Sequence, residues 1–186
     1  MTISTTERRV QMIMVITGPM KSGKSATLIN MIREIWVKGS EVHCYKPTND
    51  TRSKYIESRN GSKEECATAH PDYASLALLS YRFDKDIVIA IDEFQFFKDP
   101  GIVNTIKKIA ENNTVIISGL DLTSELNPFG FMQDVIDIAD ETIFIHGKCE
   151  CCGDKSVYSK ANFKKDAEIV IGDEAYSSVC RSCYNS

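Results

Sequence analysis

Gly18-Pro19-Met20-Lys21-Ser22-Gly23-Lys24-Ser25 is the stretch that decides the fold of this chain. It fits the pattern G-x-x-x-x-G-K-[ST] of a phosphate-binding loop. An apolar run at 12–16 precedes it and predicts a buried parallel strand, and residues 26–32 continue with helical spacing. A strand that delivers a glycine-rich turn to a helix N-terminus is the arrangement that binds phosphate. An accidental glycine turn is the alternative, and the flanking elements make it the weaker interpretation.

The residue types in this loop suit a nucleoside triphosphate. Gly18 and Gly23 allow the backbone to curl so that successive N–H groups point at phosphate oxygens. Lys24 can bridge the β- and γ-phosphates, and the Ser25 hydroxyl can bind Mg²⁺. We therefore expect a nucleoside triphosphate with Mg²⁺ at this loop.

Composition narrows the class of protein. The chain has 186 residues, of which 42% are hydrophobic and 26% charged, as in an ordinary globular protein. Its net charge of −4 argues against a protein that coats nucleic acid. No apolar run approaches the roughly 20 residues of a membrane span, and no export signal opens the chain. These features predict a cytoplasmic enzyme with no membrane or nucleic-acid partner.

A second apolar stretch, 86–91, ends in the carboxylates Asp92 and Glu93. This is the Walker B pattern, in which a strand delivers an aspartate beside the Mg²⁺ of the phosphate loop. We expect Asp92 to face the metal, partly through water, and Glu93 to point the other way as a free base, because adjacent strand residues face opposite sides. The alternative is a helix N-cap or a solvated corner. Three aromatic side chains follow within 94–97 and suggest a flat apolar substrate, although core packing would also explain them.

The order of elements predicts an α/β fold. Strands and helices alternate from residue 12 to 145, which favours a P-loop NTPase-like, mainly parallel sheet with helices on both faces. The strand candidate at 41–45 leads into a polar segment that contains Asp50 and Arg52, at the ligand side of such a sheet. These two residues could serve Mg²⁺ and a phosphate, or form an ordinary solvated pair.

The last 39 residues differ in character from the rest. Cys149 with Cys152 and Cys180 with Cys183 form two C-x-x-C pairs, the spacing of a structural zinc site with four thiolates. Cys151 lies inside the first pair, and the two-residue spacing argues against it as a ligand. A redox pair or free thiols is the alternative. We expect residues 1–147 to form the nucleotide-binding domain and residues 148–186 a small zinc-binding domain.

The ordered motifs resemble a known family. GPMKSGKS, KPTNDTR, DEFQFF, LDLTSELNPFG, CECC and CRSCY follow one another from about Met12 to Tyr184, and this set resembles the type II thymidine kinases. The resemblance implies transfer of the γ-phosphate of ATP to the 5′-hydroxyl of thymidine or deoxyuridine. It also implies a lasso loop in the zinc domain, a homotetramer and possible feedback inhibition by dTTP.

The resemblance also assigns residues by position. Glu93 would take the proton from the 5′-hydroxyl, and Tyr176 with the lasso backbone would form the wall that recognises the pyrimidine edge. The nucleotide site would contain Gly18 to Ser25, Asp50, Arg52, Asp92 and Gln95. The base pocket would contain Met20, Phe96, Leu120, Ser124, Phe129 and Ser159. The lasso would contain Glu168, Ile169, Val170, Ile171 and Gly172.

The chain departs from the family pattern at several positions. Lys21 and Ser124 stand where the family usually has an aromatic residue, Phe94 where a small residue is usual, and Ser159 where threonine is usual. The segment 171–176 is one residue shorter. These changes leave the phosphoryl-transfer residues intact and bear on nucleoside affinity and selectivity.

Two other functions fit parts of the sequence. A zinc-containing ATPase that acts on DNA or a protein partner would be expected to show a basic face, which this acidic chain lacks. A catalytically inactive nucleotide-binding scaffold would be expected to lose some of Lys24, Ser25, Asp92 and Glu93, all of which are present.

Overall fold

A six-stranded sheet forms the centre of the computed structural model, which describes residues 11–50, 55–163 and 173–186. The strand order is β5-β2-β6-β7-β1-β8, and every pairing in this sheet is parallel. Its strands are β1 (Met12–Thr17), β2 (Val42–Pro47), β5 (Ala67–Ala69), β6 (Val88–Ile91), β7 (Thr114–Ser118) and β8 (Glu141–Phe144). The expected α/β fold with a mainly parallel sheet is confirmed.

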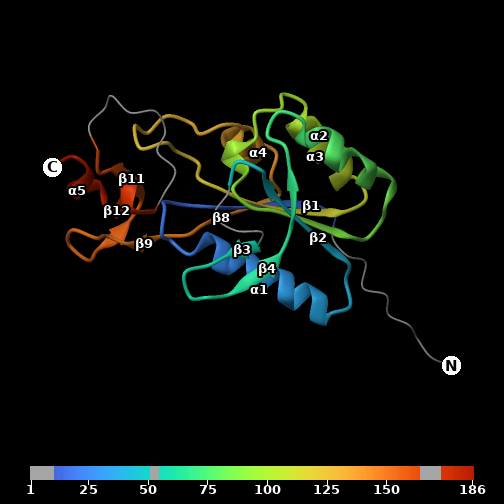
Figure 1. The fold of residues 1–186 in the computed structure, drawn as a ribbon, viewed down its shortest axis with the longest axis horizontal. Helices are drawn as coiled ribbons and strands as arrows, with labels where there is room; N and C mark the ends of the chain where they lie inside the picture. Colours follow the sequence, from blue (N-terminus) through green and yellow to red (C-terminus); the bar gives the residue numbers. More distant parts are fainter. Residues whose placement is uncertain (1–10, 51–54, 164–172) are drawn as a thin grey trace.

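Helices cover both faces of the sheet, as Figure 1 shows. One face carries α1 (Lys24–Val37) and the hairpin of β3 (Tyr55–Glu57) and β4 (Lys63–Glu65). The other face carries α2 (Ala74–Leu78), α3 (Ile102–Ala110) and α4 (Met132–Asp137).

Alternation along the strands creates a separate core on each face. Ile89 and Ile91 of β6 pack with α2, α3 and α4, whereas Val88 and Ala90 of the same strand pack with α1 and the hairpin. Successive strand residues point to opposite faces, so a strand buried on both sides must be apolar throughout. The continuous apolar run in β6 is explained in this way.

Connections at the carboxyl ends of the strands create the candidate site. β1 leads directly into the phosphate loop and α1, and β6 leads into Asp92, Glu93 and the 3₁₀ turn η2 (Phe94–Phe96). Ligands of open parallel sheets bind at this edge.

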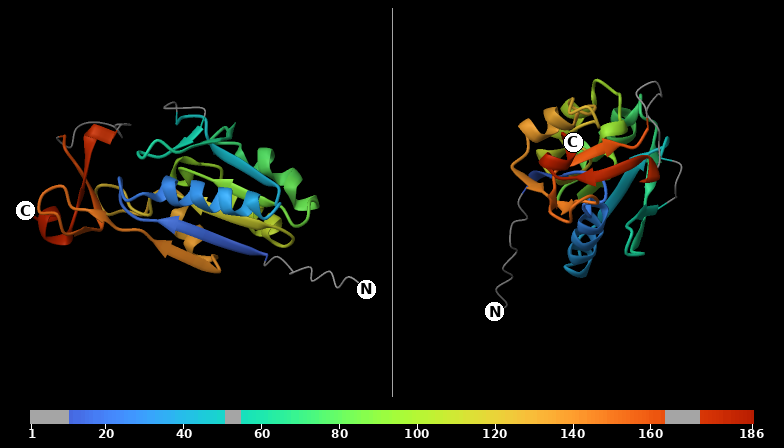
Figure 2. Two further views of the ribbon diagram at one scale, coloured as in Figure 1. Left: turned by 90° about the horizontal axis from the view of Figure 1, so that it is seen from below. Right: turned by 90° about the vertical axis from the view of Figure 1, so that its left-hand side faces the viewer.

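The C-terminal unit, defined as residues 147–163 and 173–186, lies at the same end of the sheet (Figures 1 and 2). It contains two antiparallel strand pairs, β9 (Gly147–Lys148) with β10 (Lys155–Ser156) and β11 (Tyr158–Ala161) with β12 (Tyr176–Val179). The turn η3 (Asp173–Ala175) precedes β12, and the short helix α5 (Arg181–Tyr184) follows it.

Short elements complete the sheet and its cover. β5 forms one edge of the sheet, and α4 ends at Asp137. α2 continues directly into the 3₁₀ turn η1 (Leu79–Phe83). Predicted site residues Arg52, Glu168, Ile169, Val170, Ile171 and Gly172 lie outside the described residues.

Candidate active site

Two glycines give the phosphate loop a backbone conformation that residues with a side chain rarely adopt. Gly18 has φ 137°, and a Cβ there would lie 2.0 Å from the carbonyl oxygen of Ile145. Gly23 has φ 100° and ends the loop at the N-terminus of α1. The Ser22 hydroxyl is buried and makes no hydrogen bond to the described residues, which leaves it available to a phosphate oxygen.

Lys24 lies beneath this loop with its ammonium group directed at main-chain oxygens. Its Nζ donates to the carbonyl oxygens of Gly18 at 3.0 Å and Pro19 at 2.8 Å. Burial lowers the pKa of Lys24, while the carboxylates of Glu93 and Asp92 oppose that shift. A cation held among carbonyl groups and acids in this way is suited to neutralise phosphate charge.

Asp92 and Ser25 form the candidate Mg²⁺ site. The Ser25 hydroxyl donates to Asp92 Oδ2 at 3.1 Å, so the two side chains converge as the Walker B pattern predicts. Burial, and then the nearby Glu93 carboxylate, raise the pKa of Asp92 to about 6. A buried acid with a costly negative charge favours a bound cation.

Glu93 reaches the site by a different backbone route from the one expected. β6 ends at Ile91, and Glu93 has the left-handed conformation with φ 52°. Both carboxylates line the same cavity, so the alternation of strand residues, expected to direct them to opposite sides, does not describe their placement. Residue type alone gives no signal for such a conformation in glutamate.

Gln95 fixes the orientation of Glu93. Its Nε2 donates to Glu93 Oε2 at 2.6 Å, and its Oε1 accepts the N–H of Leu120 at 3.0 Å. A Cβ on Gly119 would lie 2.7 Å from the same Oε1. The amide is therefore enclosed and can present only its N–H to the carboxylate.

A single cavity of about 690 Å³ joins these groups. Its apolar part contains Phe96 and Phe129, whose rings meet edge-on with centroids 5.6 Å apart. The predicted residues that line it are Met20, Lys21, Gly23, Lys24, Ser25, Asp50, Asp92, Glu93, Gln95, Phe96, Leu120, Ser124, Phe129, Ser159 and Tyr176. The predicted phosphate and base residues thus share one cavity.

Sequence reasoning missed the basic residues that the second strand and the hairpin bring to the cavity. Lys46 lies in the cavity wall, is 1% exposed and donates to Asp50 Oδ2 at 3.2 Å. Arg59 at the hairpin tip lines the same cavity. Strand β2 runs to Pro47, so it buries a lysine that had appeared to belong to a solvated loop.

The four predicted zinc ligands come together in the C-terminal unit. The sulfur atoms of Cys149, Cys152, Cys180 and Cys183 all lie within 4.8 Å of one another. Cys152 Sγ is 3.6 Å from Cys180 Sγ. Zn–S bonds of about 2.3 Å in a tetrahedron place sulfur atoms about 3.8 Å apart, so the cluster fits zinc. Cys151 is exposed and outside the group.

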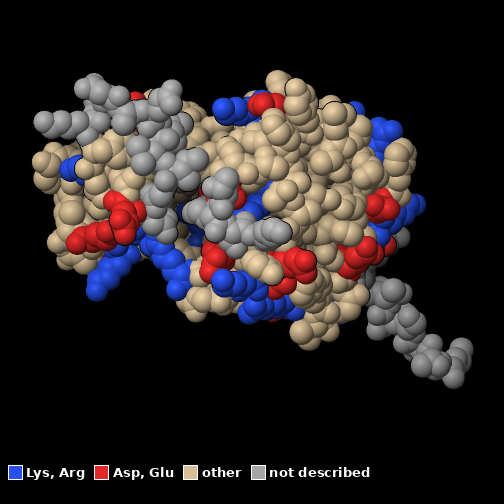
Figure 3. All heavy atoms as spheres, viewed as in Figure 1, with Lys and Arg blue, Asp and Glu red and all other residues tan. Residues whose placement is uncertain are grey.

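Figure 3 shows charged side chains of both signs on one face of the molecule. Among the described residues visible there, acidic and basic side chains are interspersed and form no continuous basic surface. Within the described part of the chain, no helix has the length and apolarity needed to cross a membrane.

Comparisons with known proteins agree on one family. The family model described as "Thymidine kinase" matches residues 11–184. The chain is 37% identical over 180 residues to a thymidine kinase of Bacteroides thetaiotaomicron, covering 95% of this chain and 88% of that protein. A thymidine kinase of Porphyromonas gingivalis is 35% identical over 175 residues, with 92% and 84% covered. One from Bacteroides fragilis is 36% identical over 182 residues, with 95% and 88% covered.

Proposed function

The chain belongs to the thymidine kinase family, and from that premise we propose that it transfers the γ-phosphate of ATP to the 5′-hydroxyl of thymidine or deoxyuridine. The observation that carries this proposal is the single cavity in which Lys24, Asp92 and Glu93 lie beside an aromatic pocket. A phosphate donor and a nucleoside acceptor need such adjacent charged and apolar regions.

The phosphate loop would hold the donor. Its backbone N–H groups and Lys24 would bind and neutralise the β- and γ-phosphates, and Arg52 would contribute a further cation to that site. Ser25 and Asp92 would hold Mg²⁺, which draws charge from the phosphate oxygens when it is bound. Asp50 is already held by Lys46, so its contact with a phosphate-bound cation would be indirect.

Glu93 would act as the general base. Its carboxylate takes the proton of the 5′-hydroxyl as that oxygen attacks the γ-phosphorus, and the bond from phosphorus to the bridging oxygen of ADP breaks. Gln95 donates to Oε2 of Glu93, which holds the carboxylate in the cavity. Lys24 neutralises the charge that develops on the transferred group and on ADP.

The apolar part of the cavity would hold the pyrimidine. Phe96, Phe129 and Leu120 provide flat and aliphatic surface, and Met20, Ser124, Ser159 and Tyr176 complete the lining. Tyr176 packs edge-on against Phe163 with ring centroids 5.5 Å apart, which fixes the tyrosine beside the nucleoside. The resemblance assigns Glu168 to Gly172 to the lasso loop, and these residues lie outside the described part of the chain.

The cysteine cluster would hold one structural Zn²⁺ that stabilises the C-terminal unit. The two C-x-x-C pairs come from opposite ends of that unit, so the ion would join β9 and β10 to β12 and α5. From the family resemblance we also infer a cytoplasmic homotetramer that dTTP inhibits. Exposed Val37, Phe83 and Phe144 provide apolar surface that association would bury.

Replacement of Glu93 tests the base assignment. Glu93→Gln keeps the shape of the side chain and removes the basic oxygen, so kcat for thymidine phosphorylation should fall by about 10²–10⁴. ATP affinity should change little, because Lys24, Ser25 and Asp92 remain. Glu57 also lines the cavity, so Glu57→Gln is the matched control and should keep kcat within a few-fold. A Glu93→Gln enzyme with near-normal kcat would disprove this role.

A further inference from the structure

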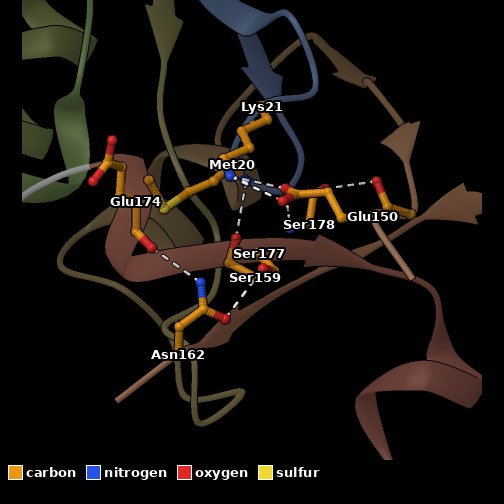
Figure 4. Close-up of polar contacts among 9 residues, drawn as sticks. Met20, Lys21, Glu150, Ser159, Asn162, Glu174, Ser177 and Ser178 are labelled. Atoms are coloured by element: carbon orange, nitrogen blue, oxygen red, sulfur yellow. Dashed lines mark hydrogen bonds and ion pairs between the residues drawn. The ribbon is translucent and has the colours of Figure 1, made fainter.

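Successive residues of the phosphate loop rest on the C-terminal unit. The N–H of Met20 donates to the Ser159 hydroxyl on β11 at 2.9 Å (Figure 4). The Cα of Ser22 approaches Gly147 so closely that a Cβ there would lie 3.3 Å from it. Ser159 is 6% exposed, so the contact belongs to the interior rather than to the surface.

Lys21, between those two residues, makes an ion pair with the same unit. Its Nζ lies 2.9 Å from Glu150 Oε1 and 3.1 Å from Glu150 Oε2, so one ammonium contacts both oxygens of one carboxylate. Lys21 also has φ 63°, a conformation that costs a non-glycine residue free energy. A contact that holds the Lys21 side chain therefore helps to maintain the shape of the loop.

Glu150 joins this ion pair to both cysteine pairs. It follows Cys149 directly in the first C-x-x-C pair. Its N–H donates to the carbonyl oxygen of Ser178 at 2.9 Å, and its Oε1 accepts the N–H of Ser178 at 2.9 Å. Ser178 lies on β12, two residues before Cys180 of the second pair. Figure 4 shows Glu150 between the loop and the strand.

We propose that Lys21 and Glu150 are positioning residues that couple the cysteine cluster to the phosphate loop. Metal in the cluster fixes Glu150 and β12, which hold Lys21 and the loop in the phosphate-binding conformation. Because coupling between two sites is reciprocal, bound nucleotide raises the metal affinity by the same factor by which metal raises the nucleotide affinity. This inference rests on the proposed zinc and ATP sites and adds a connection between them.

A simpler role for Lys21 is direct contact with a phosphate. The two roles differ in the effect of Glu150→Gln. If Lys21 only supplies charge to phosphate, removal of the Glu150 carboxylate frees that charge and nucleotide affinity rises or stays constant. If the pair positions the loop, nucleotide affinity falls in both Lys21→Met and Glu150→Gln. The sign of the change therefore separates them.

The test measures the zinc affinity of the full-length protein. Zinc is distributed at equilibrium between the protein and a chromogenic chelator, with and without saturating Mg²⁺ and the β,γ-imido analogue of ATP. The side chains of Lys21 and Glu150 are 21% and 39% exposed, which places the coupling at the low end of the usual range. In the wild type the ratio of zinc affinities with and without the analogue should therefore be at least about five. In Glu150→Gln and in Lys21→Met this ratio should approach one.

Three further variants complete the design. Glu174→Gln makes the same charge change on an exposed residue of the C-terminal unit and should keep the wild-type ratio. In the double variant Lys21→Met with Glu150→Gln the ratio should fall no further than in either single variant, because the residues act as one pair. Lys21→Arg should restore the ratio, which excludes a general loss of folding as the cause.

The outcomes are decisive in both directions. A wild-type protein that binds zinc and the analogue but shows no rise in zinc affinity overturns the coupling, as does a Glu150→Gln protein that keeps the full ratio. Failure of the wild type to bind the analogue at all, measured by calorimetry, instead overturns the proposed ATP site. Higher analogue affinity in Glu150→Gln assigns Lys21 to the phosphate and refutes the positioning role.

Discussion

Replacement of Asp92 by asparagine should make the ligand-free enzyme more stable at neutral pH. The residue is 5% exposed, and burial together with Glu93 raises its pKa from 3.8 to about 6. At neutral pH the folded protein therefore carries an ionised carboxylate in a site that disfavours it. Asp92→Asn keeps the size of the side chain and removes the charge, so the ligand-free variant should be more stable than the wild type.

The magnitude follows from the pKa shift. A rise of roughly two units at about 1.4 kcal/mol per unit corresponds to on the order of 3 kcal/mol. Because the folded pKa of Asp92 lies above the unfolded one, the stabilisation is present below about pH 4 and is lost as pH rises through about 6. The advantage of Asp92→Asn should therefore be complete above about pH 7 and smaller by roughly 1.4 kcal/mol at pH 5.

Thermal unfolding of the zinc-loaded, ligand-free protein measures this difference. At pH 7.5 the Tm of Asp92→Asn should exceed that of the wild type by about 5–10 °C for a chain of this size, and the excess should shrink at pH 5. Mg²⁺ with ATP should raise the Tm of the wild type far more than that of the variant, because the proposed Mg²⁺ site includes this carboxylate. The exposed residue Asp84 supplies the control Asp84→Asn, which should change Tm little.

Two results would refute the reasoning. A lower Tm of ligand-free Asp92→Asn at pH 7.5 would mean that the carboxylate stabilises the folded state, against the direction of its pKa. A higher Tm that does not depend on pH would assign the gain to packing rather than to charge.

Two other predictions concern the loop and the metal. Gly18→Ala should weaken ATP-analogue binding at least about tenfold by calorimetry, because its Cβ would lie 2.0 Å from Ile145 O at a φ that alanine disfavours. Gly39→Ala, also at positive φ but in open space, should leave that affinity unchanged, and equal losses in both would contradict the steric argument. Metal analysis should find one zinc per chain, kept in Cys151→Ser and lost in Cys152→Ser, because Cys151 lies outside the sulfur cluster. The reverse pattern would reassign the ligands.

The parts of the fold that sequence predicted well are those encoded by local patterns. The phosphate loop and the strand before Asp92 could be recognised because glycine spacing and buried apolar runs have strong conformational consequences within a few residues. The cysteine cluster could be recognised because the spacing within each of the two C-x-x-C pairs is typical of metal ligands. In the structure, residues of the phosphate loop and Asp92 line one cavity, and the four cysteines lie close together.

The features that sequence did not predict depend on tertiary packing. Lys46 looked like a loop residue, and only the pairing of β2 with its neighbours buries it beside Asp50. The left-handed turn at Glu93 has no signature in the residue type. The ion pair of Lys21 with Glu150 joins residues 129 positions apart, and no local pattern marks such a contact.

The attachment of the phosphate loop to the C-terminal unit also determines when the site can form during protein synthesis. The loop leaves the ribosome well before the C-terminal unit, because Ser159, which accepts the N–H of Met20, lies 139 residues later. Strand β1 also stays unpaired until later parts of the chain are made, because its partners β7 and β8 occupy residues 114–118 and 141–144. At translation rates of about 5–20 residues per second, this apolar strand stays unpaired for roughly 5–20 s. The growing chain therefore exposes Met12–Thr17 during this interval, and a ribosome that stops before Glu150 releases a chain whose phosphate loop lacks its contacts with the C-terminal unit.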